Sequence, residues 1–104
     1  MVNKKNLMIV EAFKRIISKK IDIRKMILFG SRAGRDFKNE SDFDLIIVSD
    51  EFEGVKSYQR AIKMYRAWDV DYSVDFVCLT SEEFEKMKNR PTVVKLASEG
   101  GIEV

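Results

Sequence analysis

Two aspartates at the start of an apolar run constrain this sequence more than any other feature. The segments Lys25–Phe29 and Asp42–Val48 are short, largely apolar, and bounded by glycine or by polar turn residues. Such segments are typical of buried strands, so they predict two strands that flank a polar loop.

Asp42 and Asp44 lie on one side of the second predicted strand. Side chains alternate along a strand, which places both carboxylates on the same face with Cα atoms about 6.6 Å apart. Such carboxylates repel each other and are costly to desolvate unless a cation lies between them. Mg²⁺ commonly takes one or two carboxylates together with the phosphates of its substrate, so the pair predicts a nucleotide site.

Gly30 and Ser31 follow the first predicted strand and supply the other half of such a site. Glycine lets the backbone approach a ligand closely or adopt a positive φ, and a following serine can cap a short helix that faces an anion. Arg32 and Arg35 lie in the same loop, where a guanidinium can bind phosphate oxygens. Solvation or pairing with nearby acids is the equally weighted alternative for both arginines.

The order Gly30-Ser31, ten intervening residues, then Asp42-Phe43-Asp44-Leu45 resembles the signature of the DNA polymerase β-like nucleotidyltransferase superfamily. The short chain resembles its minimal nucleotidyltransferases, which pair with helical HEPN proteins in prokaryotic toxin–antitoxin operons. The usual loop of that family reads Gly-Ser-Arg-Ala-Arg-Gly, whereas this chain ends the same stretch with Gly34-Arg35.

The resemblance also implies a third acidic residue, and Asp75 within Val74-Asp75-Phe76 matches it. Two metal ions roughly 3.5–4 Å apart can clamp the attacking and leaving oxygens of a displacement. Asp42 and Asp44 would then hold the ion that carries the triphosphate. Asp75 would help to hold the second ion and accept the proton of the attacking hydroxyl, because the chain has no histidine to act as base.

Asp69 and Asp71 form a rival pair of alternating acids upstream of Asp75. They stand beside Trp68 at the beginning of a predicted strand, where turn chemistry and solvent exposure explain aspartate equally well. We interpret them as turn residues.

The motifs predict a Mg²⁺-dependent enzyme that transfers AMP from ATP to an acceptor hydroxyl. Resemblance to the minimal family implies that the acceptor is a tyrosine of a cognate HEPN toxin, which would make this chain the antitoxin. Transfer to a small molecule or to an RNA end is an alternative enzymatic function. A non-catalytic antitoxin that masks its partner by binding is an alternative from a different class.

Length and composition limit these functions further. The 104 residues predict one domain, 1–104, so a partner chain or self-association would complete the acceptor cleft. A net charge of +2 does not favour nucleic-acid binding, and the lone Cys78 excludes an internal disulfide. No stretch approaches the roughly 18 apolar residues of a membrane span, and no signal-peptide pattern is present, so we expect a cytoplasmic protein.

Periodicity predicts an α+β fold, a small mixed sheet with helices packed on one face, and the resemblance implies the nucleotidyltransferase fold. We expect the face of Val55, Tyr58, Ile62 and Tyr65 to be the apolar side of a helix that ends near Ala67. The remaining elements are a helix within Asn3–Lys20, a long strand over Trp68–Leu79, a helix after the capping box of Thr80 and Glu83, a helix ending at Gly100-Gly101, and an edge strand over Ile102–Val104.

Overall fold

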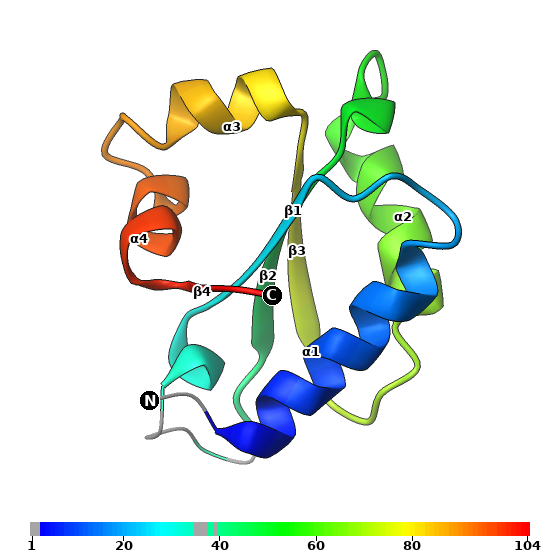
Figure 1. Ribbon diagram of the computed structural model, residues 1–104, viewed down its shortest axis with the longest axis vertical. Coiled ribbons are helices and arrows are strands. Elements are labelled where there is room, and N and C mark those ends of the chain that lie inside the picture. Colours follow the sequence, from blue (N-terminus) through cyan, green and yellow to red (C-terminus); the bar gives the residue numbers. More distant parts are fainter. Residues whose placement is uncertain (1–2, 35–37, 39) are drawn as a thin grey trace.

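The computed structural model of this chain describes residues 3–34, 38 and 40–104 (Figure 1). The helices surround one four-stranded sheet. In chain order the elements are α1 (Lys4–Ile17), β1 (Lys25–Phe29), the 3₁₀ turn η1 (Ser31–Ala33), β2 (Phe43–Val48), the 3₁₀ turn η2 (Asp50–Phe52), α2 (Ser57–Ala67), β3 (Val74–Leu79), α3 (Ser81–Met87), α4 (Val93–Gly100) and β4 (Ile102–Glu103).

The strands are ordered β3-β2-β1-β4 across the sheet. β1 runs antiparallel to both β2 and β4, whereas β2 and β3 are parallel, so α2 forms the crossover between them. Asp44 is the register partner of Phe29 on one side and of Asp75 on the other. This register brings the end of β1 and the starts of β2 and β3 to one edge of the sheet.

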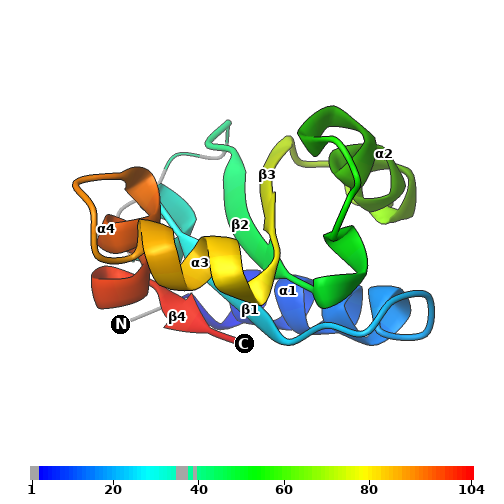
Figure 2. The same cartoon turned by 90° about the horizontal axis from the view of Figure 1, so that it is seen from above.

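Helices pack against both faces of the sheet, α1 and α2 on one and α3 and α4 on the other (Figure 2), so the expectation that helices pack on one face only is wrong. The α1/α2 face joins α1 and α2 to the sheet through Val10, Phe13, Ile17, Met26, Leu28, Phe43, Leu45, Ile47 and Met64. The α3/α4 face joins α3 and α4 to it through Ile27, Ile46, Val48, Leu79, Phe84, Val94 and Ala97. Continuous apolar runs are typical of strands buried on both sides, which explains why the centre of β2 does not alternate. The α+β class and the small mixed sheet are confirmed.

The third strand is shorter than expected. It begins at Val74 and not at Trp68, and its six residues equal the length of β2. Trp68 instead caps the C-terminus of α2, and its indole Nε1 donates a hydrogen bond to the Tyr72 carbonyl at 2.8 Å. The alternating pattern before Val74 therefore belongs to a folded connector.

The prediction of which face of α2 is buried is also wrong. Tyr58 and Tyr65 are 64% and 46% exposed, while Arg60 and Met64 are buried. The Arg60 guanidinium donates to the carbonyls of Val55 and Cys78 at 2.7 and 3.1 Å and pairs with Glu83 at 2.6 Å. These bonds draw the arginine into the interior, and the aromatic residues turn outward.

The predicted helix boundaries are confirmed by their caps. Asn3 Oδ1 accepts the backbone N–H of Lys5 at 2.9 Å at the start of α1, and Thr80 forms a reciprocal capping box with Glu83 at the start of α3. β4 is the expected edge strand beside β1. Within the described residues no helix is both long and apolar enough to cross a membrane.

Candidate active site

Gly30 forms the turn between β1 and η1, and it lies directly against Asp44. Its φ of 74° is in the left-handed region that side chains rarely adopt. A Cβ atom at this position would also collide with Asp44 Oδ2. Glycine is therefore required here both by the backbone conformation and by the approach of the carboxylate.

Ser31 follows this glycine and begins η1. The turn is closed by backbone hydrogen bonds, from the Ala33 N–H to the Gly30 carbonyl and from the Gly34 N–H to the Ser31 carbonyl, both at 3.1 Å. The side chain of Ser31 is exposed. A ligand that lies against Asp44 therefore meets an accessible hydroxyl in the same turn.

Asp42, Asp44 and Asp75 gather at the edge of the sheet where β2 and β3 begin. Asp44 and Asp75 are register partners on parallel strands, and the Phe43 N–H donates to the Ser73 carbonyl at 2.8 Å, which anchors that register. Asp42 directly precedes β2. By strand alternation Asp44 and Asp75 face the same side as Ile46 and Leu79, the α3/α4 face.

The pKa of Asp44 is raised by burial and by this clustering. Burial raises the pKa of its carboxyl, and the negative charges of Asp75 and then of Asp42 raise it further. In the described part of the chain, however, no three acidic, histidine or cysteine side chains converge tightly enough to hold a metal ion alone. The cluster is thus a set of oxygen donors that a substrate's phosphates would have to complete around a hard cation.

Asp69 and Asp71 are exposed in the connector before β3, outside the strand. Their positions agree with our interpretation of them as turn residues. Asp75 is the acid that β3 itself carries into register with Asp44.

Arg32 differs most from the sequence expectation, because it is not a solvent-facing loop residue. It is 2% exposed, and its Nε donates to the Ser41 carbonyl at 3.0 Å. Its guanidinium carbon lies 4.8 Å from the centre of the Phe43 ring and 4.5 Å from that of Tyr72. Arg32 therefore links η1 to the segment that carries Asp42. Arg35 lies outside the described residues.

Asn6 on α1 completes this arrangement, and no role in the site was predicted for it from the sequence. Arg32 Nη1 donates to Asn6 Oδ1 at 3.2 Å, and Asn6 Nδ2 donates to the Arg32 carbonyl at 3.4 Å. The missed signal is its spacing: Asn6 stands in the stripe of Val10, Phe13 and Ile17, so it is a buried polar residue on an apolar helix face. Buried amides are normally hydrogen-bonded, and this one fixes α1 against the glycine turn.

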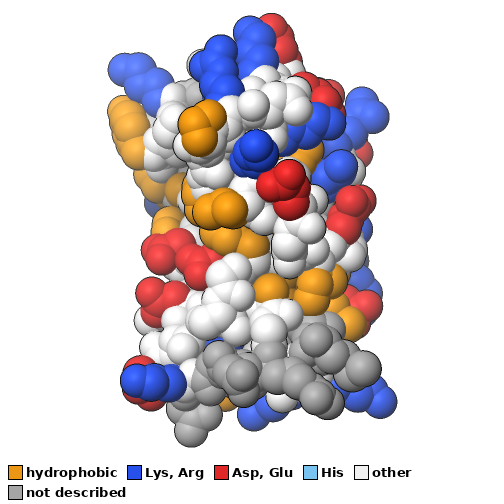
Figure 3. Space-filling model, turned by 90° about the vertical axis from the view of Figure 1, so that its left-hand side faces the viewer, with side chains coloured by type: hydrophobic (Ala, Val, Ile, Leu, Met, Phe, Trp, Pro, Cys, Tyr) orange, Lys and Arg blue, Asp and Glu red, His pale blue; other side chains and the backbone are white. Residues whose placement is uncertain are grey.

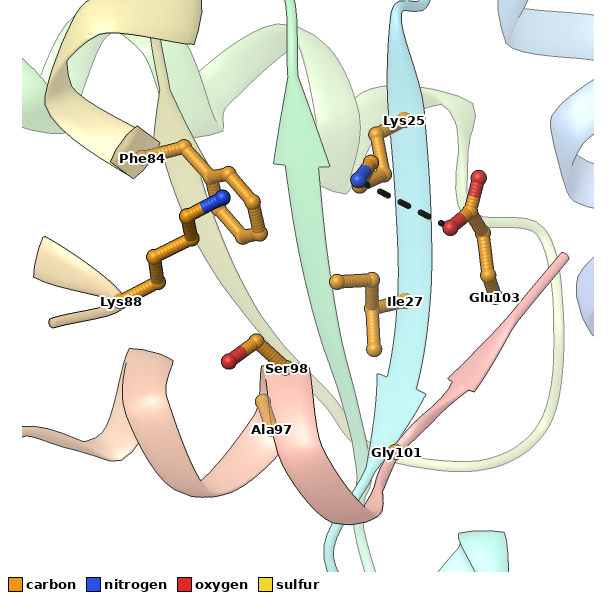
Figure 4. A pocket seen from close by; sticks show the side chains of 8 residues that line it. All are labelled: Lys25, Ile27, Phe84, Lys88, Ala97, Ser98, Gly101 and Glu103. Atoms are coloured by element: carbon orange, nitrogen blue, oxygen red, sulfur yellow. Dashed lines mark ion pairs between the residues drawn. The ribbon is translucent and has the colours of Figure 1, made fainter.

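A cavity of about 270 Å³ lies elsewhere, between α3, α4, β1 and β4 (Figure 4). Its described lining includes none of the three aspartates. The carboxylate cluster is consequently an accessible edge of the sheet and not the floor of this cavity.

Comparison with known proteins shows similarity to nucleotidyltransferases. Residues 11–93 match the family described as polymerase beta, nucleotidyltransferase. A Methanocaldococcus jannaschii protein named as a candidate protein adenylyltransferase is 35% identical over 68 residues, which are 64% of this chain and 69% of the relative.

Two solved structures have a similar fold. A candidate nucleotidyltransferase from Sulfolobus solfataricus superimposes with a TM-score of 0.68 at 17% identity, covering 95% of this chain and 78% of the other. BolA1 from Arabidopsis thaliana gives 0.57 at 19% identity, covering 72% of this chain and 94% of that one. At these identities the two structures bear on the fold alone, and since the second is not named a nucleotidyltransferase, any function has to be argued from site residues.

Proposed function

The chain belongs to the polymerase β nucleotidyltransferase family, and on that premise we propose that it transfers AMP from ATP to an acceptor hydroxyl in a Mg²⁺-dependent reaction. It is a nucleotidyltransferase; the proposal concerns the nucleotide, the metal and the acceptor. The observation that carries it is the close approach of Gly30 to Asp44, which is itself in register with Asp75. A phosphate turn and a carboxylate cluster thus share one edge of the sheet.

The donor set fits a divalent cation. Asp42, Asp44 and Asp75 offer only oxygen atoms, and the pKa of Asp44 is raised by its two neighbours, so a positive charge at this point would relieve their repulsion. These three residues would hold the metal. When bound, Mg²⁺ neutralises phosphate charge as the α-phosphorus is attacked.

The glycine turn is proposed to bind the phosphates of ATP. Gly30 removes the side chain that would separate the backbone from the ligand, and the exposed Ser31 hydroxyl donates to a terminal phosphate oxygen. Arg32 acts from the interior: its bonds to Asn6 and Ser41 hold the turn at a fixed distance from Asp42. We therefore assign Arg32 a positioning role and no direct phosphate contact.

Asp75 is the proposed general base. It is exposed on β3, an edge strand, where an incoming hydroxyl can approach it. The carboxylate takes the hydroxyl proton, the oxygen forms a bond to the α-phosphorus, and the bond to the bridging oxygen breaks so that pyrophosphate leaves with the electron pair. The chain contains no histidine that could replace this base.

The acceptor is proposed to be a tyrosine hydroxyl of a cognate HEPN toxin, which gives this chain an antitoxin role in the cytoplasm. The name of the Methanocaldococcus relative supports a protein as acceptor class. The accessible position of Asp75 also supports a second macromolecule that completes the cleft. The exposed Tyr58, Ile62 and Tyr65 on α2 favour the rival function, an antitoxin that masks its partner by binding alone.

Incubation with α-labelled ATP and Mg²⁺ tests the proposal, with the neighbouring gene product as acceptor. The wild-type chain is expected to label the partner, and Asp42→Ala/Asp44→Ala is expected to leave it unlabelled. If RNA or a small molecule were labelled and the partner protein were not, the proposed protein acceptor would be wrong. If no label moves while the two proteins still co-purify, the binding-only antitoxin is correct.

A further inference from the structure

The cavity of Figure 4 is a half-open pocket on the α3/α4 face and has a mixed lining. Ile27, Phe84 and Ala97 contribute apolar surface, and all three are nearly fully buried. The polar lining consists of Lys25, Lys88, Ser98 and Glu103. At about 270 Å³ it is slightly smaller than pockets for drug-sized ligands, which begin near about 300 Å³.

Small residues of α4 create this space. Ala97 faces the sheet, whereas the larger Leu96 is 72% exposed on the outer side of the helix (Figure 3 shows apolar side chains on this side of the molecule). At Gly101 the chain approaches β1 so closely that a Cβ would lie 2.6 Å from Ile27 Cγ2 and 3.0 Å from the Leu28 carbonyl oxygen. The helix is thus held close to the sheet at one end while a hollow remains beside Ala97 and Ser98.

The ammonium group of Lys25 is the strongest indication of a ligand. Its side chain is 35% exposed, its Nζ lies 5.1 Å from the centre of the Phe84 ring, and its ion pair with Glu103 is long, at 3.8 Å. That separation exceeds hydrogen-bond distance, and among the described residues no acceptor is bonded to Lys25 Nζ. A cation held beside an aromatic ring at the rim of this pocket can donate charge-assisted hydrogen bonds to an anion that enters it.

Lys88 adds a second cation to the same lining. Its side chain is also 35% exposed, and it pairs with Glu85 at 2.7 Å along the helix end. Ser98 Oγ donates to the Lys95 carbonyl at 3.0 Å, so its hydroxyl oxygen remains an acceptor for a protonated or hydroxylated ligand. With two lysines against Glu103, the charged side chains that line the cavity sum to a positive charge.

We propose that this cavity is a binding site for a small organic anion. A carboxylate or phosphate group of the ligand bonds to Lys25 and Lys88, and a short apolar or aromatic body lies on Ile27 and Phe84. The site is separate from the carboxylate cluster, because Lys25 lies at the opposite end of β1 from Gly30 and the described lining includes none of the three aspartates. It does not depend on the function proposed above.

Amide NMR titration of the whole chain tests the site with three probes: phenyl phosphate, benzoate and inorganic phosphate. Phenyl phosphate and benzoate are expected to give saturable shifts at the backbone amides of Ile27, Ala97, Ser98 and Gly101. Inorganic phosphate is expected to bind more weakly because it lacks the apolar body. Titration of Asp44→Asn separates this site from the catalytic edge, and its shifts at the four amides are expected to be unchanged.

Substitution of the lysines gives a matched comparison. Lys25→Met/Lys88→Met is expected to weaken binding at least about tenfold, since hydrogen bonds to charged groups each contribute more than about 1.4 kcal/mol. Lys86→Met is the control, because Lys86 pairs with Glu82 on the exposed side of α3 and does not line the cavity. Ser98→Phe fills the mouth without removing a charge and is expected to abolish the shifts.

Three results would overturn the proposal. The first is the absence of saturable shifts up to about 10 mM probe. The second is equal binding by wild type and by the double lysine variant when both give well-dispersed spectra. The third is binding of inorganic phosphate as tight as that of phenyl phosphate, which would remove the organic body from the ligand.

Discussion

Arg32 and Arg60 are buried arginines at opposite ends of the sheet, and their surroundings differ in charge. Arg60 joins α2, β3 and the cap of α3, and its partners include the carboxylate of Glu83. Arg32 joins the glycine turn to α1 and to the start of β2, beside carboxylates that repel one another. The Arg60 end contains favourable charge pairing, whereas the Arg32 end keeps unfavourable charges close together. Stability and function are therefore expected to respond oppositely at the two ends.

The largest effect is expected from Asp44→Asn at the Arg32 end. Loss of this carboxylate, which we propose to bind the metal, is expected to lower AMP transfer roughly 10³-fold. The melting temperature near neutral pH is expected to stay the same or rise, because the repulsion that raises the pKa of Asp44 is removed. Radiolabel transfer and thermal unfolding measure the two quantities. A large fall in stability would show that this end is built like the other.

Arg60→Met is expected to have the reverse effect. It leaves the Val55 and Cys78 carbonyls without their guanidinium donor and leaves Glu83 without its partner. We expect a loss of about 2–4 kcal/mol in the free energy of unfolding by urea, with transfer activity per folded molecule unchanged. Arg66→Met, at an exposed position on the same helix, is the control and is expected to be neutral.

Arg32→Lys sharpens the comparison within the catalytic end. Lysine keeps the charge but cannot place a planar fork on Ser41 and Asn6 together. We expect kcat/KM for ATP to fall roughly tenfold, while the KM for the acceptor is unchanged. In a double-mutant cycle with Asn6→Ala the two losses are expected to be less than additive, because both changes break one contact. Full additivity would argue that Arg32 contacts the nucleotide independently of Asn6.

The smallest expected effect is that of acid on the two ends. Hydrogen bonding to Arg60 lowers the pKa of Glu83 below its usual value of 4.5, so its stabilisation is present above that pH and is lost as the pH falls through the lowered pKa. The raised pKa of Asp44 has the opposite sign: its destabilisation is relieved as the pH falls through the raised value.

Melting temperatures at about pH 7 and about pH 3 separate the two contributions to stability, because the lower pH lies below the usual pKa of both carboxyl groups. Glu83→Gln is expected to reduce the loss of stability on acidification, and Asp44→Asn is expected to increase it. An equal change in melting temperature with pH in both variants and in the wild type would contradict the opposite contributions of Glu83 and Asp44 to stability.

Much of the catalytic edge was predictable from spacing. Gly30, Ser31, Asp42 and Asp44 could be placed together because each adjoins a recognisable apolar run. Asp75 was implied only by the family resemblance, and the structure places it in register with Asp44. Strand parity and turn chemistry are local properties, so short stretches of sequence carry them.

The direction of buried cations was not predictable in the same way. Arg32 was expected in the loop as a phosphate ligand or a solvated side chain, and no buried role was expected for Arg60. Each nevertheless finds hydrogen-bond partners distant in sequence, such as Asn6 and Cys78. On α2 the buried position of Arg60 turns the predicted apolar face outward. Tyr58 and Tyr65 have the helical spacing of one face, but that face is exposed to solvent. The face that a helix buries depends on its tertiary partners, which periodicity does not identify.

Because Asp44 and Asp75 lie in register on two different strands, they come together late in the synthesis and folding of the chain. A nascent chain that has emerged only as far as Ala67 already carries the glycine turn, Asp42 and Asp44, but it lacks the strand that supplies Asp75. The site is assembled only when β3 pairs with β2 after the α2 crossover, a non-local contact of the kind that forms slowly. The proposed site is therefore complete only once the sheet has formed, and a chain that ends before β3 lacks Asp75.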